Sequence, residues 1–171
     1  RHSRENEAGN SLLRLRLKRF FKDWKDPQRK QAYLELYEMM SQGHVQFKPR
    51  TTLYIIHHRL HSLMGQKCYS EAYSLIKDEC NRSEDLRRND PATYVELLDH
   101  QAHVAGRWGD YLAEGEQEKA FQLRREAVNV HRQCIDQLRR YEDFAPPLLQ
   151  SHILYQKARM LHDLSFYERV I

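Results

Sequence analysis

Three segments of the chain align with one another without gaps, and this internal repeat limits the possible folds more than any other feature of the sequence. They read LHSLMGQKCYSEA, WGDYLAEGEQEKA and ARMLHDLSFYERV, and they end at Ala72, Ala120 and Val170, 48 and 50 residues apart. Self-similarity at a fixed period of roughly 20 to 50 residues is typical of repeat architectures. We therefore expect one structural unit to occur three times.

Equivalent positions of the three segments keep the same character, as expected for a helix, a turn and a second helix. Large or apolar residues recur along the first helix at Leu60, Trp108 and Ala158, and again at Leu63, Tyr111 and Leu161. After the turn, each segment closes on a small or β-branched residue, which lets the second helix lie close to the first. The pattern predicts antiparallel helical hairpins.

This spacing resembles the tetratricopeptide repeat, a helix–turn–helix unit. The second segment matches the family pattern best, through Trp108, Tyr111, Gly115, Ala120 and Ala127. The resemblance covers about residues 50–171, and it implies an α-solenoid that binds peptides on its concave surface. The sequence departs from the family in its long period, since the usual repeat has about 34 residues. A helical bundle with coincidental spacing is the alternative interpretation.

The composition supports an all-α fold. The 171 residues include only 6 Gly and 5 Pro, and long stretches carry Leu, Glu, Gln, Lys, Arg and Ala, which lose little rotamer freedom in a helix. We predict antiparallel hairpins stacked as a tetratricopeptide-like α-solenoid of about seven helices. Asp26-Pro27 and Asp90-Pro91 each combine an N-cap residue with proline at the first helical position. Long helices are expected at about 91–113 and 116–142, and a last helix to about His162, followed by another turn.

The predicted organisation has three parts. Residues 1–10 are polar and aperiodic and are expected to form a flexible tail, residues 11–43 an N-terminal helix pair, and residues 50–171 the repeat region. The third repeat stops before its second helix. Because each repeat buries its apolar face on the next one, we expect the repeat region to continue in a longer protein.

The sequence offers no support for an enzyme, a cofactor or a metal site. It has no glycine-rich phosphate loop and no GxSxG motif. His57 with His61, and His100 with His103, have spacings that can place two imidazoles on one helix face, but no third ligand is evident. The three cysteines form no CxxC pair, and no apolar run is long enough to cross a bilayer. We expect an intracellular protein, with cytoplasm and nucleus equally compatible.

The first functional hypothesis is a scaffold or adaptor that binds a segment of another protein. In the family that the sequence resembles, the first helix of each unit lines the concave surface, which implies partner-binding roles for Tyr54, His57, His58, His61, Ala105, Gly109, Tyr155, Arg159 and His162. The same register adds Ala102, Gly106, Ala113, His152 and Gln156. The small residues of the middle unit also fit a second interpretation, in which they allow close packing between helices of the chain itself.

The second functional hypothesis is binding to nucleic acid or to another acidic surface. Residues 1–25 contain eight Lys/Arg and three acidic residues, whereas the formal net charge of the chain is only +4. The candidate basic patch is Arg14, Arg16, Lys18, Arg19 and Lys22. A packing helix whose basic residues are simply solvated is the competing interpretation of this segment. The near-neutral remainder of the chain favours the protein-binding hypothesis.

Overall fold

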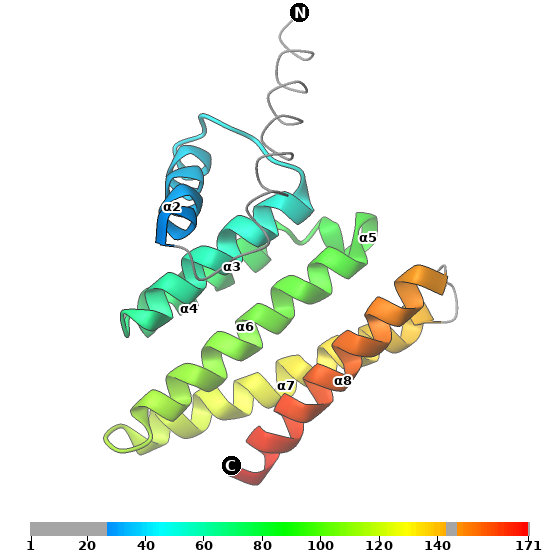
Figure 1. Ribbon diagram of the computed structural model, residues 1–171. Helices are drawn as coiled ribbons and strands as arrows, with labels where there is room; N and C mark the ends of the chain where they lie inside the picture. The colour runs from blue at the N-terminus through cyan, green and yellow to red at the C-terminus, as the bar shows by residue number, and fades with distance from the viewer. Residues whose placement is uncertain (1–26, 143–146, 171) are drawn as a thin grey trace, which may run out of the picture. The chain divides into compact units, whose positions relative to one another are not determined.

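The computed structural model describes residues 27–142 and 147–170, and within these ranges every regular element is an α-helix (Figure 1). The elements are α2 (Pro27–Ser41), α3 (Pro49–Gly65), α4 (Tyr69–Arg82), α5 (Leu86–Asn89), α6 (Pro91–Leu112), α7 (Gln117–Glu142) and α8 (Pro147–Val170). The all-α prediction is confirmed for this part of the chain. The predicted tail and first helix, at residues 1–25, lie outside the described residues.

Prolines mark where helices begin. Pro27, Pro49, Pro91 and Pro147 are each the first residue of a helix. Proline suits this position because its missing N–H is one that has no partner within the helix anyway. At α6, the preceding Asp90 caps the helix, since its Oδ1 accepts a hydrogen bond from the Thr93 N–H at 3.3 Å and its Oδ2 accepts one from the Thr93 hydroxyl at 2.7 Å. The cap predicted from Asp90-Pro91 is therefore confirmed.

The chain divides into two compact units at a boundary within α3, between Arg59 and Leu60. In the first unit, Tyr33 of α2 and Ile55 of α3 are buried and form the centre of a small core. Leu36, Tyr37, Met40 and Phe47 pack against this centre. The His58 ring stacks on Tyr33 with 3.8 Å between ring centroids, so the first unit also uses aromatic contacts.

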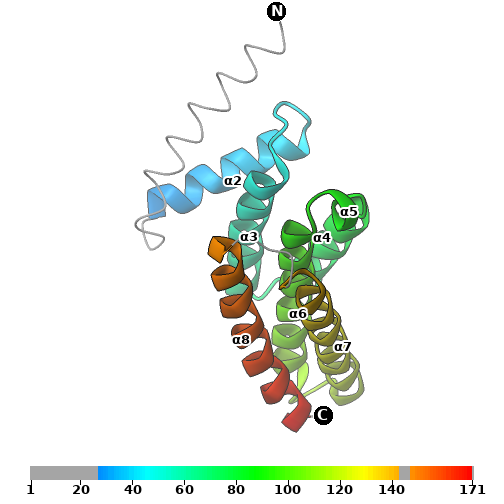
Figure 2. The same ribbon diagram turned by 90° about the vertical axis from the view of Figure 1, so that its right-hand side faces the viewer.

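The second unit is built around the hairpin of α6 and α7, which Figures 1 and 2 show running antiparallel. α8 packs on α7, and α4 and α5 pack on α6. Val95, Val104, Ile76, Leu138 and Met160 are fully buried or nearly so, and they come from all four long helices of the unit. No helix in the described ranges is both long and apolar enough to cross a membrane.

The structure corrects the prediction for the third segment. A turn was expected after His162, but α8 continues without interruption to Val170. Leu164 and Tyr167 lie on its buried side, with 9% and 5% of their surface exposed. The contacts among α4, α5, α6, α7 and α8 in the second unit are consistent with a helical bundle. The short helix α5 was not predicted.

Candidate functional site

Four aromatic side chains of α4 and α6 lie together in two ring pairs. Tyr69 and Tyr73 are one turn apart on α4, and Trp108 and Tyr111 are one turn apart on α6. The ring centroids of Tyr69 and Tyr111 are 4.9 Å apart, and those of Tyr73 and Trp108 are 5.4 Å apart. Tyr111 is 50% exposed, and the other three are half-buried. We call these four residues the aromatic surface.

Three lysines place their ammonium groups near this aromatic surface. Lys67 Nζ lies 5.9 Å from the Tyr111 ring centroid, Lys77 Nζ 5.0 Å from that of Tyr73, and Lys119 Nζ 4.7 Å from that of Trp108. These distances are in the range of cation–π contacts. Since all three lysines are exposed, the surface combines aromatic rings with positive charge.

Lys67 has an unusual backbone. Its φ of +62° lies in the left-handed region, and no other non-glycine residue among those described has a positive φ. This conformation costs an ordinary L-residue about 1 kcal/mol. It belongs to the turn between α3 and α4, where the Cys68 N–H donates to the Leu63 carbonyl at 2.9 Å. The turn thereby directs the lysine toward Tyr111.

Glu126 of α7 fixes the inner side of the aromatic surface. Its carboxylate accepts a short hydrogen bond from the Tyr73 hydroxyl and another from Gln101 Nε2 at 2.9 Å. Lys77 Nζ donates to the Tyr73 hydroxyl at 3.1 Å, which raises the pKa of Lys77. Burial, followed by the bond to Glu126, raises the pKa of Tyr73. One carboxylate thus holds groups from α4 and α6 in place.

The structure places the small residues of α6 in the interior. Ala105 is fully buried and Gly109 is buried, as are Ala102 and Gly106. A Cβ added to Gly109 would come within 2.9 Å of the Ala120 carbonyl oxygen, and one added to Gly106 within 2.2 Å of Tyr167 Cζ. Ala105 and Gly109 therefore do not line an open groove. The small stripe is a packing face, the second of the two interpretations considered for it.

The other residues predicted to bind a partner are distributed over both units. Tyr54, with 38% exposure, and the half-buried His57 and His58 belong to the first unit. His61 and His162 belong to the second unit and are exposed. The side chains of Tyr155 and Arg159 lie outside the described part, as does the whole predicted basic patch from Arg14 to Lys22. The partner-binding role of these residues stays a prediction.

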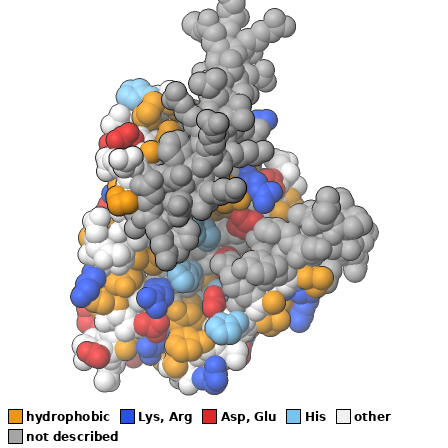
Figure 3. All heavy atoms as spheres, viewed as in Figure 1, with side chains coloured by type: hydrophobic (Ala, Val, Ile, Leu, Met, Phe, Trp, Pro, Cys, Tyr) orange, Lys and Arg blue, Asp and Glu red, His pale blue; other side chains and the backbone are white. Residues whose placement is uncertain are grey.

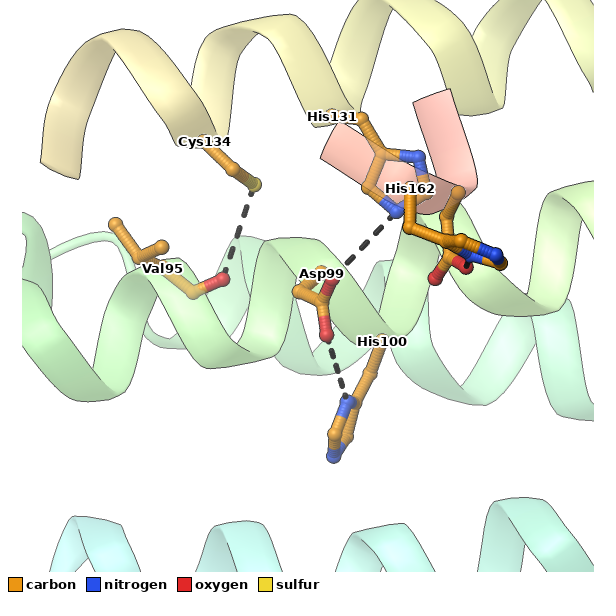
Figure 4. A network of polar contacts seen from close by, with 7 residues as sticks. Val95, Asp99, His100, His131, Cys134 and His162 are labelled. Atoms are coloured by element: carbon orange, nitrogen blue, oxygen red, sulfur yellow. Dashed lines mark hydrogen bonds and ion pairs between the residues drawn. The ribbon is translucent and has the colours of Figure 1, made fainter. Parts of the chain in front are cut away.

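A buried polar cluster links α6 to α7 (Figure 4). Asp99 and His131 are 1% and 0% exposed, and His131 Nε2 lies 3.5 Å from Asp99 Oδ1. His100 Nδ1 lies 3.9 Å from Asp99 Oδ2, and the Cys134 thiol donates to the Val95 carbonyl at 3.8 Å. Within the ranges described, no three His, Cys, Asp or Glu side chains are arranged to hold a metal ion. The cluster joins two helices of the core.

His103, one turn beyond Asp99, is affected by the same surroundings. Burial lowers the pKa of His103 to about 4, and the neighbouring His61 and His100 act in the same direction, while Asp99 and Asp163 oppose it. The His103 ring centroid is 6.1 Å from that of His61. His103 is consequently uncharged at neutral pH.

Trp108 and Tyr111 are identified from the sequence only as positions of the repeat, and Tyr73 is not identified. The sequence also does not predict that aromatic rings pair across two helices. The available signal was the spacing of aromatic residues by four on one helix and by three on the other. Asp99 and His131 carried no such signal, because isolated polar residues in a helical pattern are usually exposed.

Comparison with protein-family models, with curated proteins and with solved structures gives no match. The all-helical architecture therefore rests on the structure itself, and the resemblance to the tetratricopeptide repeat stays a prediction.

Proposed function

We propose that this chain is a non-catalytic protein-interaction module, and that the aromatic surface of α4 and α6 binds a segment of a partner protein. The observation that carries the proposal is the Tyr69–Tyr111 pair, because Tyr111 remains 50% exposed although its ring is held in place by its neighbour. Tyrosine and tryptophan dominate the energetics of protein interfaces, since they offer large contact area with few rotatable bonds.

The charges near the aromatic surface indicate the chemistry of the partner segment. Lys77 and Lys119 face Glu126 and Glu116 within the chain, at 3.6 and 3.4 Å. No acidic side chain pairs with Lys67 among the described residues, and its ammonium lies over the most exposed ring of the surface. A segment that presents an apolar or aromatic side chain beside a carboxylate would contact Tyr111 and Lys67 together.

The finer assignment to a tetratricopeptide-like repeat is part of this proposal. In the resembled family, small residues on the second helix of each unit allow close packing. Ala72, Ala120 and Ala127 are all at most 2% exposed, which supports such a role in α4 and α7. We place the partner segment on the aromatic surface rather than along the small residues of α6.

The experiment is affinity capture of partner proteins with nuclease present, comparing the wild-type chain with Tyr111→Ala and Lys67→Glu. Truncation of a central interface residue costs about 2 kcal/mol or more, so we expect partner binding to weaken roughly 30-fold in the tyrosine variant. Phe121→Ala is the matched control, because Phe121 is also an exposed aromatic residue, at 38%, but it makes no ring contact within the described part.

The outcomes separate the two functional hypotheses. The proposal predicts proteins that are retained by the wild-type chain and by Phe121→Ala and lost from the other two variants, all with unchanged circular dichroism. Equal retention by all variants would show that the aromatic surface is not the binding site. The same capture is repeated without nuclease, and proteins that are retained only in its absence would favour the nucleic-acid hypothesis.

A further inference from the structure

α8 has a second apolar side that the packing of the second unit does not use. Met160, Leu164 and Tyr167 are buried on its inner side. On the outer side, Leu154 and Leu161 are exposed to 52% and 46%, and Ala158 and Ser165 are exposed as well. Figure 3 shows hydrophobic side chains at the surface among charged and histidine side chains around α6 and the C-terminal part of α8. We call Leu154, Ala158, Leu161 and Ser165 the outer stripe.

The spacing of the outer stripe is that of a helix–helix contact. Its members follow one another at intervals of four, three and four residues. An alternation of three and four keeps residues on one side of a helix, because 3.5 is close to the 3.6 residues of one turn. Large and small residues alternate along the stripe, and none of the four is charged.

We infer that the outer stripe is the contact through which two copies of this chain associate, with their α8 helices antiparallel. A two-fold axis midway between Ala158 and Leu161 places Leu161 of each copy opposite Ala158 of the other. The same axis places Leu154 opposite Ser165. Every layer then pairs a large side chain with a small one, which fills space as close helix packing requires. A two-fold contact needs this kind of self-complementarity, because the same patch serves both subunits.

A parallel arrangement of the same two helices is less favourable. It would place leucine on leucine at two layers and small residues on each other at the other two. The leucine–leucine layers would hold the two helices apart. The layers of small residues would then contain gaps, and the van der Waals contacts across those gaps would be lost. The alternation of sizes therefore specifies the antiparallel direction.

Two charged side chains next to the outer stripe, those of Glu168 and Arg169, already have partners within their own chain. Glu168 Oε1 is 2.6 Å from Arg132 Nη2 of the same chain, so its charge is already compensated. Arg169 Nε donates to the Ser165 carbonyl oxygen at 3.0 Å along its own helix. Because the stripe itself is uncharged, association is driven by apolar burial and should depend little on salt.

Sedimentation equilibrium of the full chain over a range of concentrations tests the inference. The wild-type protein should approach twice its monomer mass of 20.6 kDa with rising concentration. In Leu161→Ala, two layers would pair one alanine with another, and in Ala158→Leu the same two layers would pair one leucine with another. Each single variant should therefore weaken association about tenfold or more. The double variant restores a large residue opposite a small one and should return to near wild-type association.

The double variant is the decisive comparison, since only a second copy of the same chain changes both sides of the contact together. A protein that remains monomeric at concentrations on the order of 10⁻⁴ M would overturn the inference. So would single variants that dimerise like wild type, or a double variant weaker than either single one. Positions 158 and 161 are both exposed within one copy of the chain, so the variants should keep the fold. Ala158→Glu is a further variant that must also abolish association, because it places one carboxylate from each copy near the two-fold axis.

Discussion

Gly106 is a residue of α6 at which even one additional carbon atom has no room. The ring of Tyr167, from α8, occupies the space where a Cβ would stand, with its Cζ and hydroxyl oxygen 2.2 and 2.3 Å from that position. The Tyr167 hydroxyl lies 3.5 Å from Asp110 Oδ2, and Asp110 is bound in turn by Arg124 at 3.0 Å. Because Gly106 has no side chain, Tyr167 of α8 can lie close to α6, where its hydroxyl approaches Asp110.

Replacing Gly106 with alanine should destabilise the chain, although alanine is the better helix former by about 1 kcal/mol. The Tyr167 ring must move from a buried position, and overpacking of this kind costs about 1–3 kcal/mol. After the gain in helix propensity is subtracted, we expect a net loss of up to about 2 kcal/mol. Urea unfolding measures it. Gly115→Ala is the control, because nothing lies within 4 Å of its Cβ position. A Gly106→Ala protein as stable as Gly115→Ala would contradict this account.

The small residues of α6 also show how far a sequence specifies a site. Their spacing identified a continuous small face correctly. The spacing does not reveal what packs against that face. Close approach by a partner peptide and close approach by Tyr167 of the same chain both require small residues there. The answer depended on a tyrosine 61 positions further along the chain, and no local pattern links it to Gly106.

At the scale of elements, the N-terminus of α6 was the most predictable feature because its cause is local. Asp90 and Pro91 satisfy or remove the backbone N–H groups that lack helical partners, whatever surrounds them. The helix bounds that depend on such signals were predicted to within about two residues.

Asp90→Ala should lower the free energy of unfolding by about 1 kcal/mol, because the Thr93 N–H loses its acceptor. The matched control is Asp85→Ala. Asp85 precedes α5 in the same N-cap position but makes no side-chain capping bond, so its replacement should change little. Urea unfolding followed by circular dichroism compares the two variants. Equal losses would mean that charge near the helix terminus, rather than the capping bond, provides the stabilisation.

The uninterrupted course of α8 shows where the repeat alignment was wrong. The first two segments carry Gly65 and Gly115 near their turns, whereas the third has neither glycine nor proline between Lys157 and Val170. Without such a residue the backbone has no reason to leave the helix, and Leu164 and Tyr167 contribute to the buried face only if it continues. Similar apolar spacing was sufficient for the alignment but not for a turn.

At the scale of the whole molecule, the helical class followed from composition and periodicity, whereas the arrangement of helices did not. Two polar contacts join different helices: Asp99 of α6 lies beside His131 of α7, and Tyr73 of α4 donates to Glu126 of α7. The paired residues are 32 and 53 positions apart in the sequence. Such pairs depend on which helix faces are brought together. The aromatic surface was hidden from the sequence for the same reason, since its two ring pairs each join α4 to α6.

Two histidines with lowered pKa values, His103 and His61, should make the stability of the chain sensitive to acid. The pKa of His103 is about 4 in the folded chain, against 6.5 for an unperturbed histidine, so the unfolded chain binds more protons between these values. Stability is therefore lost as pH falls from about 6.5 toward 4, by at most about 3 kcal/mol from this residue. The pKa of His61 is also lowered, first by desolvation of the covered part of its side chain and then by His100, and it acts in the same sense.

The measurement is thermal or urea unfolding of the wild-type chain and of His103→Gln between pH 4 and 7. The variant should lose less stability on acidification, because glutamine takes up no proton. His44→Gln serves as the control, since His44 is exposed. Parallel curves for the wild type and His103→Gln would mean that the loss in acid comes from other groups.

The outer stripe of α8 and the aromatic surface of α4 and α6 consist of different residues on different helices, so occupying one does not use up the other. If two chains pair through α8, each assembly carries two identical aromatic surfaces. A partner with two suitable segments on one chain would then bind the second surface at an effective concentration set by the linker between its segments, which is millimolar for short flexible linkers. Two contacts of modest strength would then give tight binding through avidity. The dimer would favour partners that carry several binding segments at a suitable distance from one another.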